Sequence, residues 1–415
     1  MRRLSLVLLF LLLQAPLSVA GEEAPPEAEG SVSAPSEEAV EREQGAGEDP
    51  LAQSQAQSQA EHVDKPGLWS EEPNELQLYG SARIRYRVTE NDSFWGDGGS
   101  RFGLKAKWQF RPQTWVFGAA EAGFNLFDTL DRVFNAKGRS DEEAGSVFTR
   151  LLYGGLAHPK GVAVFGKNWS AWYQVAGFTD LFESTGASAS GTYNAGTDGG
   201  NTGTGRADRT LQTRMFIDFL PQRWFKPFNL NLQVQHGEPV PQVEGVDYGT
   251  AFGVSAILHT QKEYVFGLAY NQADITDEDD PVLRAAGIDN DARAFLFGTR
   301  AFGERWYLAT VVSRLEDHET TGGGIYFDGW GWEASGRFNL YGPLWLVGGW
   351  NQLEPDGDED QAGSYRIRYG VAGLWYSFRG FKQIAYFEAR LDDSLSVDGE
   401  SPGNSYAAGI RWDLP

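Results

Sequence analysis

One repeated pattern constrains this 415-residue chain more than any other: short segments in which apolar and polar side chains alternate strictly. The stretch SRFGLKAKWQF (Ser100–Phe110) is a clear case. Its apolar set is Phe102, Leu104, Ala106, Trp108 and Phe110, and its other set is Arg101, Gly103, Lys105, Lys107 and Gln109. Successive side chains of a strand point to opposite faces, so the pattern predicts a β-strand with one apolar and one charged face.

About sixteen such segments follow one another to the carboxyl terminus. They start near Leu76, Ser100, Trp115, Ser146, Gly161, Arg209, Phe228, Tyr248, Lys262, Asp291, Glu304, Tyr326, Pro343, Tyr365, Phe381 and Asn404. Short connections such as RPQT, HPKG and TQK alternate with long ones such as ADITDEDDPVLRAAGIDN. Short turns at one end and long loops at the other are typical of a transmembrane β-barrel, whose closure pairs every backbone group in lipid. A soluble β-sandwich explains a single strand equally well but not this sorting of the loops.

The amino terminus has a different composition. MRRLSLVLLFLLLQAPLSVA has a basic start, a short apolar run and small residues near Ala20, which predicts a cleaved signal peptide over residues 1–20 and export. A transmembrane helix is the alternative, but the run is short for one. Residues 21–66 are rich in Glu, Ala, Gln, Ser and Pro and are expected to form a disordered acidic tether, since no apolar heptad favours a coiled coil.

Composition limits the partners and the chemistry. The formal net charge of -22 argues against nucleic acid as a partner, and the absence of cysteine removes disulfides, thiolate metal sites and Cys nucleophiles. No cofactor or metal site is expected. The acidic clusters Asp277 to Asp280 and Asp356 to Asp360 offer oxygen ligands to divalent cations, but their spacing matches no calcium loop, so solvated loops are the simpler interpretation.

One stretch breaks the regular pattern. FGKNWSAWYQVAGFTDLFE (Phe165–Glu183) begins as a strand, stops alternating, and is followed by a polar run to about Arg206. With LYGSARIRYR, SRFGLKAKWQF and FTRLLYGGLAH, it resembles the general trimeric porins of Gram-negative outer membranes, the OmpF/OmpC-like family, from Leu76 to the end. The resemblance implies a sixteen-stranded antiparallel transmembrane barrel over residues 76–415. It also implies that the third loop, about residues 168–206, folds inward and narrows the lumen.

The same resemblance implies a charged constriction. Loop acids at Asp180 and Glu183 are expected to face arginines on the opposite wall and to set up a transverse field. The family's PEFGG reads FESTG here, so Glu183 is the less direct match of the two. The matching wall arginines are Arg101, Arg150 and Arg209, and Glu121 in AAEAGFN matches an inward acid.

Alternation adds further inward charges. Arg83, Arg85 and Arg87 share the face of Ser81, where the family often has a lysine. Arg366, Arg368, Glu388 and Arg390 are expected to face the lumen by the same rule. The strand after the third loop leaves a choice, because its apolar residues place Arg214 inside rather than Arg209 unless a bulge intervenes. Each of these charges is also explained as a solvated group in a wide pore.

The predicted function is passive diffusion of small hydrophilic solutes and ions across the outer membrane. The alternatives are a substrate-selective channel for sugars or anions, or a barrel that anchors a surface structure. An enzyme is not expected, because the five His stand in no catalytic motif and GxSxG and HExxH are absent. The resemblance implies a homotrimer among outer-membrane lipid and lipopolysaccharide. The chain ends IRWDLP, whereas many family members end on a Phe that is read during barrel assembly.

Overall fold

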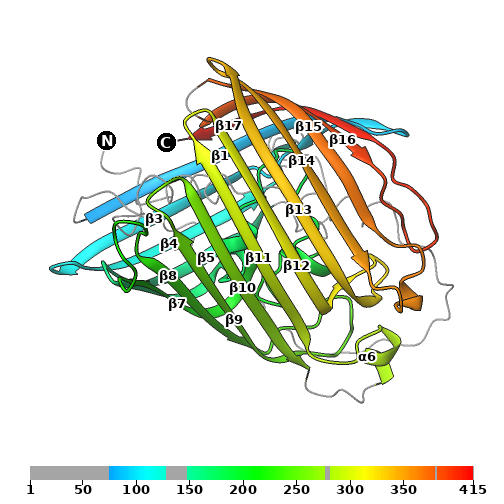
Figure 1. Ribbon diagram of the computed structural model, residues 1–415, viewed down its shortest axis with the longest axis horizontal. Helices are drawn as coiled ribbons and strands as arrows, with labels where there is room; N and C mark the ends of the chain where they lie inside the picture. Colours follow the sequence, from blue (N-terminus) through cyan, green and yellow to red (C-terminus); the bar gives the residue numbers. More distant parts are fainter. Residues whose placement is uncertain (1–73, 128–146, 276–280, 379–380, 415) are drawn as a thin grey trace, which may run out of the picture. The chain divides into compact units, whose positions relative to one another are not determined.

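The computed structural model describes residues 74–127, 147–275, 281–378 and 381–414, and these residues form one closed antiparallel β-barrel (Figure 1). The signal peptide, the acidic tether and the cluster Asp277 to Asp280 lie outside the described residues. The strands are β1 (Asn74–Val88), β2 (Ser93–Asp97), β3 (Arg101–Arg111), β4 (Thr114–Phe124), β5 (Val147–His158), β6 (Gly161–Trp169), β7 (Arg206–Ile217), β8 (Phe228–His236), β9 (Tyr248–His259), β10 (Tyr264–Ile275), β11 (Ala292–Gly303), β12 (Trp306–Thr320), β13 (Tyr326–Tyr341), β14 (Leu344–Pro355), β15 (Ile367–Ser377), β16 (Gln383–Asp392) and β17 (Ser405–Leu414).

The barrel wall has sixteen strand positions around its ring, although the described residues contain seventeen strands. Each strand pairs with its neighbours in the chain, and β1 closes the ring by pairing with β17. On its other side β1 pairs with β3 near its start and with β2 near its end. The strands β2 and β3 therefore occupy one position in the ring, as a single interrupted strand. The interruption was not predicted from the sequence. Its cause is Asp97, whose carboxylate accepts the N–H groups of Gly99 (2.6 Å) and Ser100 (2.8 Å) and turns the chain between the two strands.

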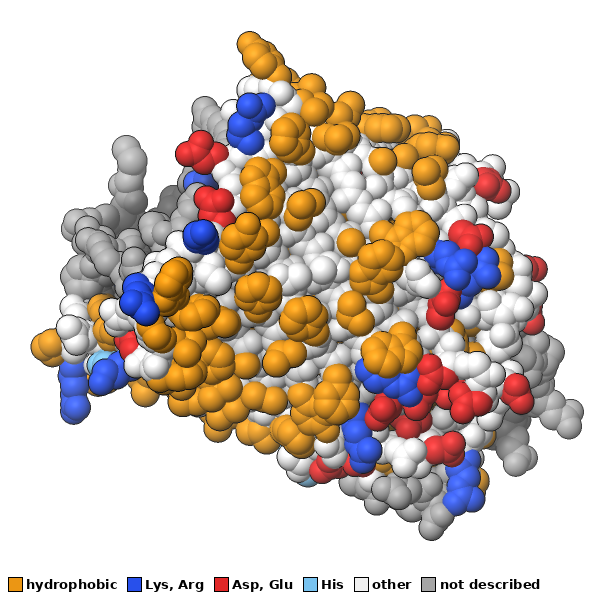
Figure 2. Space-filling view, in the orientation of Figure 1, with side chains coloured by type: hydrophobic (Ala, Val, Ile, Leu, Met, Phe, Trp, Pro, Cys, Tyr) orange, Lys and Arg blue, Asp and Glu red, His pale blue; other side chains and the backbone are white. Residues whose placement is uncertain are grey.

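The outer face of the barrel is apolar, as the alternation predicts. Leu76, Phe165 and Leu268 are 72 %, 66 % and 59 % exposed although they are among the most hydrophobic residue types. Apolar side chains spread across the middle of the wall in Figure 2, while Lys, Arg, Asp and Glu gather towards its two ends. Exposure of this kind is stable in lipid rather than in water.

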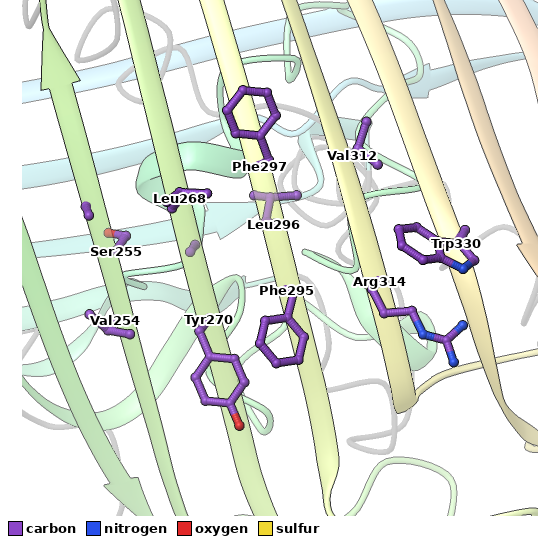
Figure 3. A pocket seen from close by; sticks show the side chains of 12 residues that line it. Val254, Ser255, Leu268, Tyr270, Phe295, Leu296, Phe297, Val312, Arg314 and Trp330 are labelled. Carbon is purple, nitrogen blue, oxygen red and sulfur yellow. The ribbon is translucent and has the colours of Figure 1, made fainter.

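A shallow apolar groove of about 630 Å³ lies on this outer wall, across β9 to β13 (Figure 3). Its lining includes Leu268, Phe297, Val312 and Trp330. Arg314, a charged residue of this lining, is bound to Asp356 (2.6 Å) and Asp328 (3.2 Å). The groove is therefore part of the lipid-facing surface and is separate from the lumen.

The two ends of the barrel differ. Short turns join β3 to β4, β5 to β6 and β13 to β14, and the first strand begins and the last strand ends at this same end. The long connections lie at the opposite end, where the short helix α6 (Pro281–Ala285) is found (Figure 1). No helix in the described part of the chain is long and apolar enough to cross a membrane.

Candidate functional site: a constriction inside the barrel

The long connection from β6 to β7, residues 170–205, lies inside the barrel rather than beyond its rim. It contains the helix α5 (Tyr173–Ala176) and a single 3₁₀ turn (Asn194–Gly196). Val175 and Phe178 pack against Gly267 of β10 and Gly298 of β11, where an added Cβ would meet them at 2.7 to 3.3 Å. Glycine at these wall positions gives the loop room to lie against the sheet. We call residues 170–205 the inner loop.

Three glutamates on the wall hold the inner loop. Glu388 of β16 accepts the backbone N–H groups of Glu183 (2.9 Å) and Ser184 (2.8 Å). Glu333 of β13 accepts the N–H of Ala189 (2.8 Å), and Glu319 of β12 accepts that of Ala195 (2.6 Å). Backbone N–H groups away from regular structure need acceptors, and a carboxylate is a strong one.

The two expected loop acids, Asp180 and Glu183, lie three residues apart in the first half of the inner loop. Glu183 forms ion pairs with Arg411 of β17 and with Arg83 of β1 (3.7 Å). Beside it, Arg87 donates to the carbonyl oxygen of Ser184 (2.9 Å). Glu183 was expected from the sequence to face Arg101 and Arg150 across water, whereas the structure places it in direct contact with the wall of β1 and β17. Arg411 was not predicted, although alternation with the outward Trp412 points it inward.

Asp180 is held within the inner loop. Its Oδ2 accepts the hydroxyls of Tyr173 (2.7 Å) and Tyr193 (3.2 Å), and its side chain is buried. Neither tyrosine was singled out from the sequence. They fix the carboxylate where the polypeptide turns from α5 towards the tip.

The arginines of β3 and β5 stand away from the anchors Glu333 and Glu319. In the ring order β3 to β5 lie half way round from β11 to β13, so Arg101 and Arg150 project into the barrel from the side opposite Glu333. Arg150 pairs with Glu121 of β4 at 2.7 Å, and both side chains are buried. Arg85 lies between Arg83 and Arg87 on the inward face of β1, as alternation predicts.

The choice between Arg209 and Arg214 has a definite outcome. Arg209 has a left-handed φ of 47° next to an irregularity in the pairing of β6 with β7, and it turns towards Glu238 (2.6 Å) with two thirds of its side chain exposed. Arg214 instead donates to Gln174 of α5 at 2.5 Å. Arg209 therefore does not line the constriction; Arg214, on the face that simple alternation from the outward Leu211 assigns to the lumen, contacts the inner loop instead.

The acidic cluster Asp356 to Asp360 lies at the long-loop end and is bound to its neighbours. Asp356 pairs with Arg314, and Glu359 accepts the N–H of Asp328 (3.0 Å). Burial raises the pKa of the Glu359 carboxyl above its ordinary value, and the nearby aspartates raise it further. Within the described ranges no group of three or more His, Cys, Asp and Glu is placed to hold a metal ion.

Gly331 of β13 offers a test of how closely the inner loop fits the wall. A Cβ at this position would collide with the carbonyl oxygen of Ala189 and with the Ser313 hydroxyl. We expect Gly331→Ala to push the inner loop into the lumen and to lower single-channel conductance. Gly348→Ala is the matched control, since its Cβ would meet only a backbone oxygen at 3.4 Å. Equal conductance of the two folded variants would contradict the close packing.

Comparison with known proteins agrees with this architecture. No family model matches the chain. Outer membrane porin PhoE of Escherichia coli (strain K12) is 26 % identical over 356 residues, covering 81 % of this chain and 92 % of that protein. Outer membrane protein F of Serratia marcescens is 25 % identical over 269 residues, covering 62 % of this chain and 64 % of that protein.

Solved porin structures share the fold. The Salmonella typhi OmpF complex with daunomycin has a TM-score of 0.66 at 20 % identity and covers 83 % of this chain and 99 % of its own. An anion-selective porin from Comamonas acidovorans has a TM-score of 0.58 at 12 % identity, covering 82 % of this chain and all of its own. Together with the closed barrel and the inward third loop, these similarities bear out the resemblance of the sequence to OmpF-like outer membrane porins and support the function expected from it, passive diffusion of small hydrophilic solutes across the outer membrane.

Proposed function

We propose that the inner loop and the basic wall of β1, β3 and β5 form the constriction of this porin, and that small anions pass through it more readily than cations. The observation that carries the proposal is the charge of the wall. The strands β1 and β3 carry seven Arg and Lys residues and one acid, Glu75, although the chain as a whole is strongly acidic.

The state of the loop acids supports the same preference. Glu183 is neutralised in direct contact with two arginines, and Asp180 is hydrogen-bonded by two tyrosines. Glu333, Glu388 and Glu319 are engaged with backbone N–H groups. A passing ion therefore meets more cationic than anionic side chains where charges act through a confined volume of water. The role of each residue in the field, from Asp180, Glu183 and Glu121 to Arg101, Arg150, Arg83 and Arg85, is part of this proposal.

Single-channel recording in a KCl gradient tests the proposal directly. We expect ohmic conductance with a reversal potential on the anion side of zero, larger at low salt. A cation-selective reversal potential would contradict the assigned field. Saturation of the current by one sugar or one organic anion would favour the substrate-selective alternative, and a silent, folded protein would favour the surface anchor. We expect no hydrolase activity, because the relatives are channel proteins.

We also propose that the porin is a homotrimer in the outer membrane. One solved porin of the same fold, OmpT of Vibrio cholerae, is described as a trimer form, at 13 % identity and a TM-score of 0.54. The second long connection, which the family resemblance assigns to the subunit contact, lies outside the described residues. Cross-linking in mild detergent should give a trimer that dissociates on heating. A product that stays monomeric at every cross-linker dose would count against the assembly.

The remaining parts of the chain follow the same scheme. We propose that residues 1–20 are removed on export, that residues 21–66 form a separate tether, and that lipopolysaccharide and other outer-membrane lipids cover the apolar outer face. The tether has too few apolar residues to contribute a packed core. Deletion of residues 21–65 behind an intact signal is therefore expected to leave a folded, heat-modifiable barrel.

A further inference from the structure

The connections at the short-turn end of the barrel are basic. Among those that the structure describes, six basic residues stand against three acids, Asp218, Glu263 and Glu304. We call these connections the short-turn rim, and its basic residues are Lys160, Arg223, Lys226, Lys262, Arg305 and Lys382. In an outer membrane porin this end faces the periplasm.

The inner wall next to this rim has the same sign. Within four residues of the short-turn ends of the described strands lie five inward cations: Lys107, Arg214, Arg300, Arg337 and Arg411. Two acids lie at the same depth, Glu75 beside Lys107 (3.7 Å) and Asp413 beside Arg411 (3.3 Å). This level of the lumen therefore stays positive by three formal charges when its acids are counted with it.

The opposite end is strongly acidic. The described long connections other than the inner loop contain fourteen acids and only two basic residues, Arg284 and Arg366. We call them the long-loop rim: residues 89–92, 237–247, 281–291, 356–366 and 393–404. Acidic side chains are dense at this end in Figure 2, on the right. Four strand arginines pair with acids of this rim, and the rim is still acidic by eight formal charges when they are counted with it: Arg209, Arg293, Arg314 and Arg368.

The contrast between the two rims is more than a consequence of composition. The chain has 57 acids and 35 Lys and Arg, which accounts for an acidic rim but not for a basic one. A tilted strand of twelve residues holds the two rims about 30 Å apart. This separation is about three Debye lengths at 0.1 M salt, so each rim acts on the ions at its own mouth.

We infer that the opposed rims make the pore a rectifier, which conducts more current when the long-loop side is positive than when it is negative. A charged mouth concentrates ions of the opposite sign, so anions gather at the short-turn mouth and cations at the long-loop mouth. A positive voltage on the long-loop side drives both kinds of ion from the mouth that concentrates them towards the constriction. The reverse voltage draws both away and leaves fewer carriers inside. This inference needs an open pore but no net preference for anions.

The test uses the oriented full-length protein in planar bilayers, in the same KCl solution on both sides. The chain has no cysteine, so Gly357→Cys gives a unique label in the long-loop rim, at a position where an added Cβ would meet nothing within 4 Å. A membrane-impermeant maleimide polymer that lowers the current from one side only identifies the long-loop side. We expect the currents at equal voltages of opposite sign to differ by about 1.5-fold or more at 0.1 M KCl, and to be nearly equal at 1 M KCl.

Variants of the short-turn rim locate the cause. Lys160→Glu, Arg223→Glu and Lys262→Glu combined make both rims acidic, and the currents of the two signs should then become nearly equal at 0.1 M KCl. All three side chains are exposed, so the barrel should fold. The matched control is Lys262→Glu with Glu263→Lys, which exchanges two charges within one turn and leaves the rim charge unchanged. Its current ratio should equal that of the parent.

Three results would overturn the rectifier. They are equal currents of both signs in the oriented parent at 0.1 M KCl, a larger current with the long-loop side negative, and a ratio that the triple variant leaves unchanged. A cation-selective reversal potential combined with the expected rectification would contradict the proposed anion preference alone. A folded barrel that does not conduct would overturn both.

Discussion

Replacing Arg101 and Arg150 with Gln is expected to move the reversal potential in a KCl gradient strongly towards cations. Two positive charges leave the basic wall, and Glu121 loses its 2.7 Å partner and faces the lumen as an uncompensated acid. Unit charges a few ångströms apart interact by about 1 to 4 kcal/mol between water-like and protein-surface dielectrics. The shift should therefore be large at low salt and smaller at high salt.

A charge-balanced double variant separates the effect of lost charge on selectivity from the effect of structural damage. Arg150→Gln combined with Glu121→Gln removes one charge of each sign, so selectivity should stay close to that of the parent. Asp180→Asn combined with Glu183→Gln should move the reversal potential towards anions, because Arg83 and Arg411 then have no acid at the loop tip. Asp356→Asn with Asp358→Asn changes as many charges at the long-loop end. If those outer changes shift selectivity as far as the inner ones, the inner loop is not the constriction.

The second large effect is expected from Glu388→Ala, which should enlarge the pore. Glu388 accepts four hydrogen bonds, from the N–H groups of Glu183 and Ser184, the Ser184 hydroxyl and the Trp375 indole. Hydrogen bonds to a charged group contribute about 1.5 to 3 kcal/mol each, so the tip of the inner loop should detach from the wall of β16. Larger sugars should then enter in a liposome-swelling assay, and conductance should become noisy.

Two further variants make this result specific. Glu388→Gln keeps an acceptor oxygen and should give an intermediate phenotype. Glu354→Ala removes a wall carboxylate that binds Arg368 rather than the loop, and should leave the sugar cut-off unchanged. Unchanged permeation in a folded Glu388→Ala barrel would mean that Glu333, Glu319 and the packing of Phe182 against Gly349 hold the loop without it.

The barrel itself was predictable because alternation is a local property of the sequence. Every predicted segment starts within about three residues of an observed strand. The short strand β2 was not predicted as a separate strand. Its separation from β3 depends on Asp97, which caps the turn between them, and five residues are too few to show a clear alternation. Inward positions such as Arg83, Arg85 and Glu388 followed from the same alternation.

The contacts of the inner loop were less accessible to sequence reasoning. That Glu183 would contact Arg411 depends on two segments more than two hundred residues apart, and no local pattern records it. Alternation already placed Arg214 inside, but the contact of Arg209 with Glu238 depends on one left-handed backbone angle next to an irregular pairing. Tyrosines that orient Asp180 look, in the sequence, like any other aromatic residues near a strand end. Local rules fix which face a side chain occupies, whereas its partner depends on how the loop crosses the lumen.

The seam between the first and last strands has a consequence for when this protein can fold. Gly80 to Val88 pair with Leu414 to Tyr406, and Ser81 donates to Asp413 at 2.7 Å across 332 residues of sequence. Until the last ten residues arrive, β1 has a bare edge that cannot be left in hydrocarbon. Contacts so distant in the chain form late and slowly. Synthesis and export must therefore be finished before the ring can close, and a chain truncated before β17 should remain an open, aggregation-prone sheet rather than a smaller pore.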